Sequence, residues 1–412
     1  MNSRVDQARL SREIEELASI SDADAPAVTR IVFSSTDMKA RAWLRERCEK
    51  AGLAVRQDPV GNMFAHWTGS LPDAPVVGTG SHIDAIPNAG KYDGVVGVLG
   101  GLEAIRSLQA SGYRPKHSIE LVMFTSEEPT KFGIGCLGSR MLSGTLSVEE
   151  AKKLTDPDGS SLEEVRANAG VKGPLEDVKL PRNYFKAFIE LHIEQGPLLE
   201  QGKIPLGVVT HIAAPASMRI SIEGAGGHAG AVLMTERRDA LCAAAELILA
   251  IESAARTSHA PDTVATVGIC TVFPGAINSI PSRVQFSVDV RDTSLERREE
   301  TVRAVRAAKA DIATRRMVAI SEEVLNSDAP ATCATEIVEA ISASCRKHKQ
   351  GFLSMVSRAY HDSLFISRIA PAAMLFIPCR KGYSHRPDEY ASPEDIERGV
   401  VVLAETLRSL AS

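Results

Sequence analysis

The stretch from Gly80 to Gly94 limits the possible folds of this chain more than any other part of the sequence. A short apolar segment at residues 76–79 leads into it and a helix with an apolar stripe follows it, so we expect a strand–loop–helix connection. Its Gly, Pro and Asn residues allow the loop to bend until His82 and Asp93 lie close together. Because an imidazole and a carboxylate are common metal ligands, the stretch predicts an α/β fold with a metal site beyond a strand. On its own, the stretch is also compatible with a plain turn capped by an aspartate.

Three further apolar segments are each followed by a histidine or by acids. They are residues 119–124 before Glu127 and Glu128, residues 187–191 before His192, and residues 373–377 before His385. Taken one at a time, such residues are more often structural or solvated than metal ligands. In a parallel sheet, however, the carboxyl ends of the strands share one edge, so these candidates are expected to converge. Three imidazoles and two carboxylates are enough for two metal ions that share one carboxylate.

Glu127 and Glu128 are adjacent, and consecutive side chains of an extended chain point in opposite directions. One carboxylate is therefore free to bind a metal while the other acts as a general base on a water molecule. A pair of glutamates is more commonly a solvated helix start, but the apolar segment before this pair argues against that interpretation.

The length of 412 residues is too great for one ordinary hydrophobic core, so we expect two domains. Near residue 213 the pattern changes, because Met218, Ile220 and Ile222 alternate with polar residues, as is typical of a strand with one buried face. A β-α-β-β-α order follows, and the α/β pattern resumes near residue 331.

The sequence therefore predicts a discontinuous α/β domain with a mixed, mainly parallel sheet flanked by helices. This domain is expected to comprise residues 1–213 and 329–412. Residues 214–328 are expected to form an inserted α+β domain with a four-stranded antiparallel sheet and two helices.

Two helices have clear end signals in the sequence. One, which stops at Gly52, is expected to be capped by Thr36 or Asp37. The last helix is expected to be capped by Ser392, with Pro393 at its first position.

Composition excludes several classes of function. A net charge of −5 gives no indication of a nucleic-acid surface, and no apolar run approaches the ~18 residues of a membrane span. The seven cysteines are dispersed, odd in number and never in a Cys-x-x-Cys pair, which predicts reduced thiols. Cys136, near the acidic pair, is the one cysteine to follow. The N-terminal residues Met1–Asp6 are polar, so we expect no secretory signal and a cytoplasmic protein.

Six motifs, in order along the chain, resemble those of the hydantoinase/carbamoylase amidases, which belong to the aminoacylase and carboxypeptidase superfamily of dinuclear metallohydrolases. They are Gly80–Asp84, Tyr92–Gly94, Thr125–Glu128, Glu190–Gly196, Gly224–Gly230 and Gly382–His385. The resemblance extends from about residue 35 to the C-terminus.

The resemblance implies two divalent metal ions and assigns a ligand set to each. One ion is expected to be held by His82, Asp93 and His192. The second is expected to be held by Asp93, Glu128 and His385. Manganese is the metal that the family favours, although imidazoles and carboxylates also suit zinc, cobalt or nickel.

The resemblance also implies catalytic roles. Glu127 is expected to be the general base, and Asp84 is expected to orient the His82 imidazole from behind. His228, in a glycine-rich turn, is expected to polarise the scissile carbonyl across the interface of a homodimer. The inserted domain would then serve as both lid and dimerisation domain. The alternative for His228 is an ordinary surface histidine.

Four further residues are expected to contact the substrate. Arg291 lies on the polar face of a predicted strand and suits two-point binding of a carboxylate, although a surface charge is the alternative. The other three expected contacts are Asn278, Gln195 and His361.

Members of this family hydrolyse a C–N bond in a ureido or amide group beside a carboxylate. The stretches Ser81–Gly100 and Phe124–Ile134 are similar to the ureidoglycolate amidohydrolases, whereas carbamoylases more often have glycine and a small residue at Pro129 and Thr130. This implies hydrolysis of ureidoglycolate to glyoxylate, ammonia and carbon dioxide in purine catabolism. The alternatives are an N-carbamoyl-L-amino acid hydrolase, an allantoate amidohydrolase, a peptidase or aminoacylase relative, and a binding protein without activity.

Overall fold

The computed structural model describes residues 5–412 and divides into two compact units. The first comprises the chain up to Thr210, with Cys333–Met355 and His361–Ser412, and the second comprises His211–Thr332 and Val356–Tyr360. The expectation of a polar N-terminus without a signal rests partly on residues 1–4, which lie outside the described residues.

Residues 356–360, which the sequence placed in the first domain, belong with the second unit. Ser357 accepts a backbone hydrogen bond from Ala213, and Arg358 forms a 2.6 Å ion pair with Asp262. These contacts join partners that are far apart in the sequence, so local patterns gave no sign of them.

The first unit is built on a mixed sheet with the order β8-β17-β7-β4-β6-β3-β2, in which β16 also pairs with β8. Its strands are β2 (Ala54–Gln57), β3 (Met63–Trp67), β4 (Val76–His82), β6 (Ile119–Phe124), β7 (Phe185–Ile193), β8 (Leu206–Ile212), β16 (Phe352–Ser357) and β17 (Ala372–Ile377). The four neighbours β17, β7, β4 and β6 are parallel, whereas β8 pairs antiparallel with β17, β3 with β6, and β2 with β3. The predicted α/β class with a mixed sheet is confirmed, with the parallel pairing confined to these central strands.

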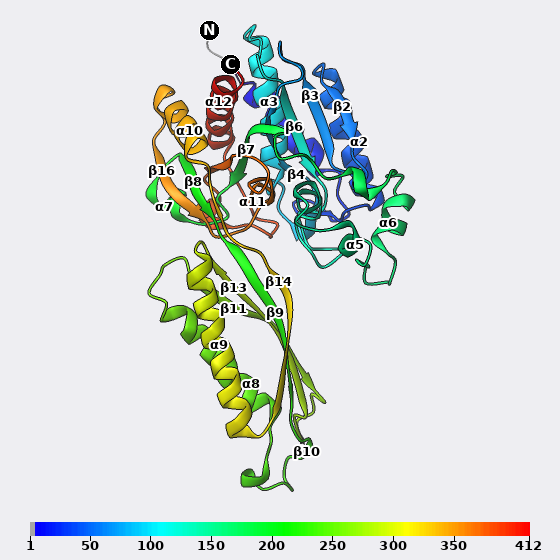
Figure 1. Ribbon diagram of the computed structural model, residues 1–412, viewed down its shortest axis with the longest axis vertical. Coiled ribbons are helices and arrows are strands. Elements are labelled where there is room, and N and C mark those ends of the chain that lie inside the picture. Colours follow the sequence, from blue (N-terminus) through cyan, green and yellow to red (C-terminus); the bar gives the residue numbers. More distant parts are fainter. Residues whose placement is uncertain (1–4) are drawn as a thin grey trace. The chain divides into compact units, whose positions relative to one another are not determined.

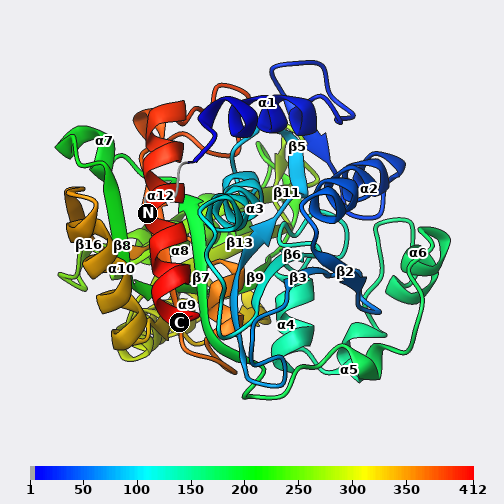
Figure 2. The same cartoon turned by 90° about the horizontal axis from the view of Figure 1, so that it is seen from above.

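Helices cover both faces of this sheet. The helices of this unit are α1 (Gln7–Ala18), α2 (Ser35–Lys50), α3 (Val95–Ala110), α4 (Leu137–Ser143), α5 (Val148–Ala151), α6 (Leu162–Asn168), α7 (Leu198–Gly202), α10 (Thr335–Lys347), α11 (Asp362–Ile366) and α12 (Pro393–Leu410), with 3₁₀ turns η1 (Leu175–Asp177) and η3 (Arg380–Gly382). On one face α3 and α12 lie side by side and pack on β7 through Leu191 (Figure 2). On the other face, Phe188 of the same strand joins a buried cluster with Leu137 and Ile366. The alternation of side chains along β7 thus separates two cores.

The N-caps of α2 and α12 show which helix ends the local sequence predicts correctly. Ser392 caps α12 and Pro393 is its first residue, as predicted. The predicted cap of α2 at Thr36 or Asp37 is wrong, because the Ser34 side chain accepts the hydrogen bond from the Asp37 N–H. The Asp37 carboxylate instead accepts from Phe33 N–H, four residues earlier, and from Arg41 Nε, one turn later in the same helix.

Residues 85–89, expected to be loop, form a strand, β5 (Ala85–Ala89), that pairs antiparallel with β1 (Val28–Arg30). The buried Arg30 guanidinium supports this pair by donating to Ile83 O at 2.6 Å and Leu17 O at 2.5 Å. The segment between His82 and Asp93 is therefore fixed in place and is not a free turn.

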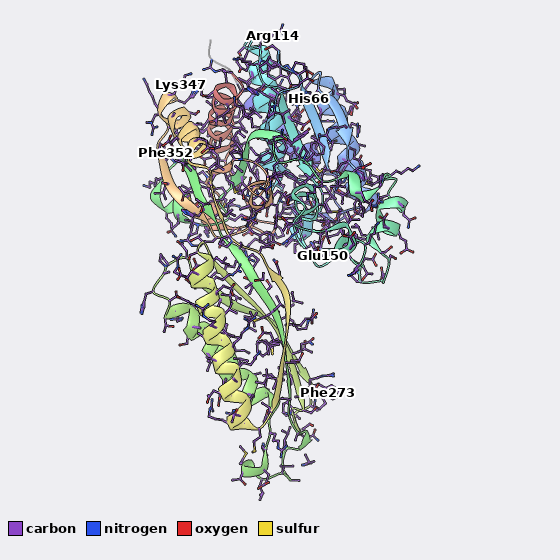
Figure 3. The ribbon with its side chains drawn as sticks, in the orientation of Figure 1. His66, Arg114, Glu150, Phe273, Lys347 and Phe352 are labelled. Atoms are coloured by element: carbon purple, nitrogen blue, oxygen red, sulfur yellow. The ribbon has the colours of Figure 1, made fainter. Side chains whose placement is uncertain are left out.

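The second unit has a four-stranded antiparallel sheet with the order β11-β13-β9-β14 and two long helices, as predicted. Its elements are β9 (Ala214–Glu223), β10 (Gly227–His228), η2 (Met234–Glu236), α8 (Ala240–Arg256), β11 (Val264–Phe273), β12 (Ser279–Ile280), β13 (Arg283–Asp292), α9 (Leu295–Arg316), β14 (Ala319–Ser327) and β15 (Ala331–Thr332). Helices α8 and α9 lie side by side (Figure 1). Ile220, Leu247 and Phe286 lie in the core that the sheet and helices enclose. At the end of edge strand β11, Phe273 is exposed (Figure 3).

Within residues 5–412, the structure has no helix that combines the length and the apolar character required to cross a membrane.

Candidate metal centre

The candidate ligands lie at the carboxyl ends of four neighbouring parallel strands. His82 is the last residue of β4, His192 lies one residue before the end of β7, Glu128 follows β6, and His385 follows β17. Asp93 precedes α3, in the connection that leaves β4 and β5. This arrangement is the one expected for a ligand site in an α/β sheet.

Two groups of ligand atoms share the Asp93 carboxylate. Asp93 Oδ1 lies 3.1 Å from His192 Nε2 and 3.8 Å from His82 Nε2. Asp93 Oδ2 lies 3.2 Å from His385 Nε2, which is also 3.2 Å from Glu128 Oε1. In each group the donor atoms lie within 4.8 Å of one another, so each could hold one metal ion. A carboxylate with one oxygen in each group is the geometry of a bridging ligand.

The charges of this cluster also fit two cations. Hydrogen bonds with Asp93 and Glu128 raise the pKa of His385 to about 11. Burial alone would lower the pKa of His192, but the hydrogen bond with Asp93 raises it to about 9. Burial works against the ionisation of Asp93, yet the surrounding imidazoles hold its pKa well below its usual range. Protons on His192 and His385 thus supply positive charge that metal ions would otherwise supply, whereas burial lowers the pKa of His82.

The ligand imidazoles have fixed orientations. His82 Nδ1 lies 3.0 Å from Asp84 O and His192 Nδ1 lies 2.9 Å from Ile193 O. Because a carbonyl oxygen only accepts, each Nδ1 carries a hydrogen and each Nε2 is directed at Asp93. A side chain at Gly94, where φ is +65°, would place its Cβ 2.5 Å from the His82 ring, so a glycine is needed there.

The Asp84 carboxylate has a different role from the predicted one of orienting the His82 imidazole. Its carboxylate lies 3.7 Å from His82 Nδ1, which is too long for a hydrogen bond, and its backbone carbonyl is the group that orients the ring. The carboxylate instead accepts from the N–H groups of Glu127 and Glu128, at 3.2 and 3.1 Å. Asp84 therefore fixes the backbone of the acidic pair.

Glu127 lies beside the ligands without joining either group. Its Oε2 is 3.8 Å from His82 Nε2, and its Oε1 accepts a hydrogen bond from the Cys136 thiol at 3.3 Å. Burial, together with the nearby carboxylates of Glu128 and Asp362, raises the pKa of Glu127 well above its usual value. Such a carboxyl group can accept and hold a proton near neutral pH.

Gln195 and His361 lie at the same centre. Gln195 Nε2 donates to Asp93 Oδ2 at 2.8 Å, and its Oε1 is buried without a hydrogen-bond partner among the described residues. His361 is only 2% exposed, and its ring centroid lies 4.5 Å from that of His192.

The second unit brings two of its three predicted residues together. His228 in β10 is paired with Ser279 in β12, and the neighbouring Ala229 N–H donates to Asn278 O at 2.9 Å. Gly230 N–H donates to His228 Nδ1, so the hydrogen of the neutral ring is on Nε2, and the ring is exposed. Arg291 lies on β13, where its Nε donates to Asp289 at 2.7 Å.

Buried polar residues that the sequence did not predict surround the ligands. Glu190 accepts from Ser81 Oγ at 2.7 Å and from Ser363 N–H at 3.0 Å, and Glu389 accepts from the N–H groups of Tyr92 and Asp93. A glutamate within the apolar run 187–191 was a signal for Glu190. Glu389 lies in a polar stretch of the sequence, which gave no such signal.

The chain is similar to known enzymes over nearly its full length. Residues 78–409 match the model of Peptidase family M20/M25/M40. A ureidoglycolate hydrolase of Arabidopsis thaliana is 49% identical, over 99% of this chain and 87% of that protein. An N-carbamoyl-L-amino acid amidohydrolase of Geobacillus stearothermophilus is 37% identical, over 98% of both chains. The crystal structure of AtUAH in complex with glyoxylate superimposes with a TM-score of 0.91 at 48% identity and covers 99% of this chain and 98% of that one.

Proposed function

This chain belongs to Peptidase family M20/M25/M40, and on that premise we propose that it hydrolyses the ureido C–N bond of ureidoglycolate to give glyoxylate, ammonia and carbon dioxide. The observation that carries the reaction class is the Asp93 carboxylate, whose two oxygens each lie among ligand atoms of a separate group. The substrate is supported by the 49% identity with a ureidoglycolate hydrolase. The AtUAH complex with glyoxylate, the proposed product, supports it further.

The five ligands are His82, Asp93 and His192 for one cation and Asp93, Glu128 and His385 for the other. Two divalent cations, which we propose to be manganese, would supply Lewis acidity toward the ureido carbonyl and acidify a water molecule. Glu127 takes the proton from the attacking water and returns it to the leaving nitrogen. Its raised pKa suits both halves of that task.

The substrate carboxylate is held by Arg291 and Asn278. An arginine offers a planar pair of N–H donors, which match the two oxygens of a carboxylate. Asp289 keeps the Arg291 guanidinium in one orientation through contacts at 2.7 and 3.3 Å. Gln195 and His361, which lie at the metal centre of the first unit, are further contacts of the substrate.

His228 polarises the scissile carbonyl across the interface of a homodimer. The Gly230 N–H occupies Nδ1, so the exposed Nε2–H is the group that donates to the carbonyl oxygen as negative charge develops there. A neutral imidazole is sufficient for this part, because it acts as a hydrogen-bond donor.

We place the enzyme in the cytoplasm. All seven cysteines are free thiols, five of them buried, which supports a reducing compartment.

The test is a substrate panel on manganese-loaded protein, with ureidoglycolate, allantoate and N-carbamoyl-L-amino acids assayed side by side. We expect the highest kcat/KM with ureidoglycolate, with release of glyoxylate and ammonia, and loss of activity after chelation. A higher kcat/KM with an N-carbamoyl-L-amino acid would instead favour the second candidate, a carbamoylase, which the 37% identity to such an enzyme supports.

A further inference from the structure

We propose that Glu389 is a positioning residue, which latches the loop that carries His385 onto the loop that carries Asp93 and so fixes the second metal site. The proposal rests on the proposed function for the existence of that site. It concerns a residue that lies outside both ligand groups.

The His385 loop needs such a latch. His385 is the most exposed of the five ligands, with 48% of its side chain exposed, and it lies in neither a helix nor a strand. Its partner Asp93 is far away in the sequence, so their 3.2 Å contact depends on how two separate loops are held together. From Lys381 to Tyr390, Glu389 is the only buried residue.

Glu389 reaches across to the Asp93 loop with both of its oxygens. Oε1 accepts from the N–H groups of Tyr92 and Asp93, at 2.8 and 3.1 Å. Oε2 lies 2.9 Å from Ser384 Oγ, and the same hydroxyl lies 2.8 Å from Asp93 Oδ2. The backbone and the carboxylate of Asp93 are therefore both tied to the loop that positions His385.

The Asp93 loop is shaped to receive this side chain. A Cβ added at Gly90 would lie 2.3 Å from the Glu389 Cβ and 2.4 Å from its Oε1. A residue larger than glycine at position 90 would therefore displace the Glu389 side chain from its contact with the Asp93 loop. The fit at Gly90 and the hydrogen bonds at Tyr92 and Asp93 are independent observations of the same contact.

The test is manganese binding to the metal-free protein, measured by titration calorimetry without substrate, for the wild type and matched variants. Glu389→Ala should weaken one of the two sites by about 10- to 100-fold, the usual effect of losing a group that orients a ligand. Glu389→Gln should keep near wild-type affinity, because its amide oxygen still accepts from both N–H groups and its NH₂ reaches Ser384. Asp388→Ala is the control on the same loop, because the exposed Asp388 side chain pairs, among residues 5–412, with Arg386 alone.

Gly90→Ala tests the latch from the other side and should weaken the same site. Combined with Glu389→Ala it should add little, because both changes remove one interaction. The latch would be overturned if Glu389→Ala bound two manganese ions with wild-type affinity, or if the losses of affinity in Gly90→Ala and Glu389→Ala were fully additive. Either result would leave the proposed function intact. Fewer than two manganese ions bound by the wild type would overturn the dinuclear premise and the latch with it.

Discussion

At the scale of single residues, Glu127 and Glu128 are neighbours with different surroundings. Glu128 Oε1 lies 3.2 Å from His385 Nε2, whereas Glu127 lies beside His82 and accepts from the Cys136 thiol. The strand before them ends at Phe124, so the opposite directions expected of an extended chain are not what separates them. Ser126 has a φ of +55°, and the Asp84 carboxylate holds both of the following N–H groups.

Replacement of Glu127 by glutamine should lower kcat by roughly 10²- to 10⁴-fold, the range for loss of a general base. The metal content should be unchanged, because Glu127 belongs to neither ligand group. The measurement is steady-state kinetics together with elemental analysis of the same sample. Glu128→Gln is the matched comparison and should lose metal. Undiminished turnover in Glu127→Gln would rule out its assignment as the base.

At the scale of secondary-structure elements, Arg30 joins α1, β1 and the end of β4. Arg30 is 1% exposed, and its guanidinium donates to the carbonyls of Leu17, Ile20 and Ile83. Arg30→Met should lower the free energy of unfolding by about 3 kcal/mol or more, because hydrogen bonds from a charged donor are lost and buried carbonyls are left without partners. Urea unfolding measures this, with Arg12→Met on the exposed face of α1 as control. Equal midpoints for Arg30→Met and the wild type would contradict this role.

Local sequence specified those elements whose ends depend on neighbouring residues. The apolar stripes and the Ser392–Pro393 pair were sufficient for α3 and α12. Where several cap formers follow one another, at Ser34–Asp37, the sequence pattern did not decide between them: Ser34 caps the helix, and Asp37 pairs with Arg41 one turn later in the same helix. Strand β5 depended on a partner, β1, far earlier in the chain, and its sequence alone indicated a loop.

The same distinction applies to the candidate site. The five proposed ligands lie at or beyond the carboxyl ends of apolar strands or just before a helix, so their convergence was predictable from a parallel sheet. The groups that hold them were not. Glu389 occupies a polar stretch like any exposed glutamate, and only the folded loops place it against Tyr92 and Asp93.

At the scale of the whole molecule, metal binding should stabilise the fold increasingly as the pH rises. In the metal-free protein the pKa values of His192, about 9, and His385, about 11, lie above the ~6.5 of an unfolded histidine. The stabilisation of the fold by protonated His192 and His385 is fully present below pH ~6.5. It is lost as the pH rises through the pKa values that these residues have in the folded state. The Tm of the metal-free protein should therefore fall between pH 6.5 and ~9.5, while manganese, which replaces the protons, keeps the Tm of the loaded protein higher. If the difference in Tm between the manganese-loaded and the metal-free protein narrowed with rising pH, this prediction would be contradicted.

The proposed homodimer makes a separate prediction about the whole molecule. Glu127→Gln and His228→Ala should each be inactive alone. If His228 acts across the interface, a mixed dimer has one site with both wild-type residues, so subunit exchange at equal amounts should restore about a quarter of the sites. The recovery of ammonia release after mixing measures this. No recovery, with exchange verified by mass spectrometry, would place His228 on the same subunit as Glu127.

The most direct test of the account is a crystal structure of the manganese-loaded protein with anomalous scattering data recorded at the manganese edge. We predict two anomalous peaks that share Asp93. One should be bound by His82 and His192, and the other by Glu128 and His385. A single peak, or peaks whose ligands are other residues, would contradict the dinuclear centre on which the proposed reaction depends.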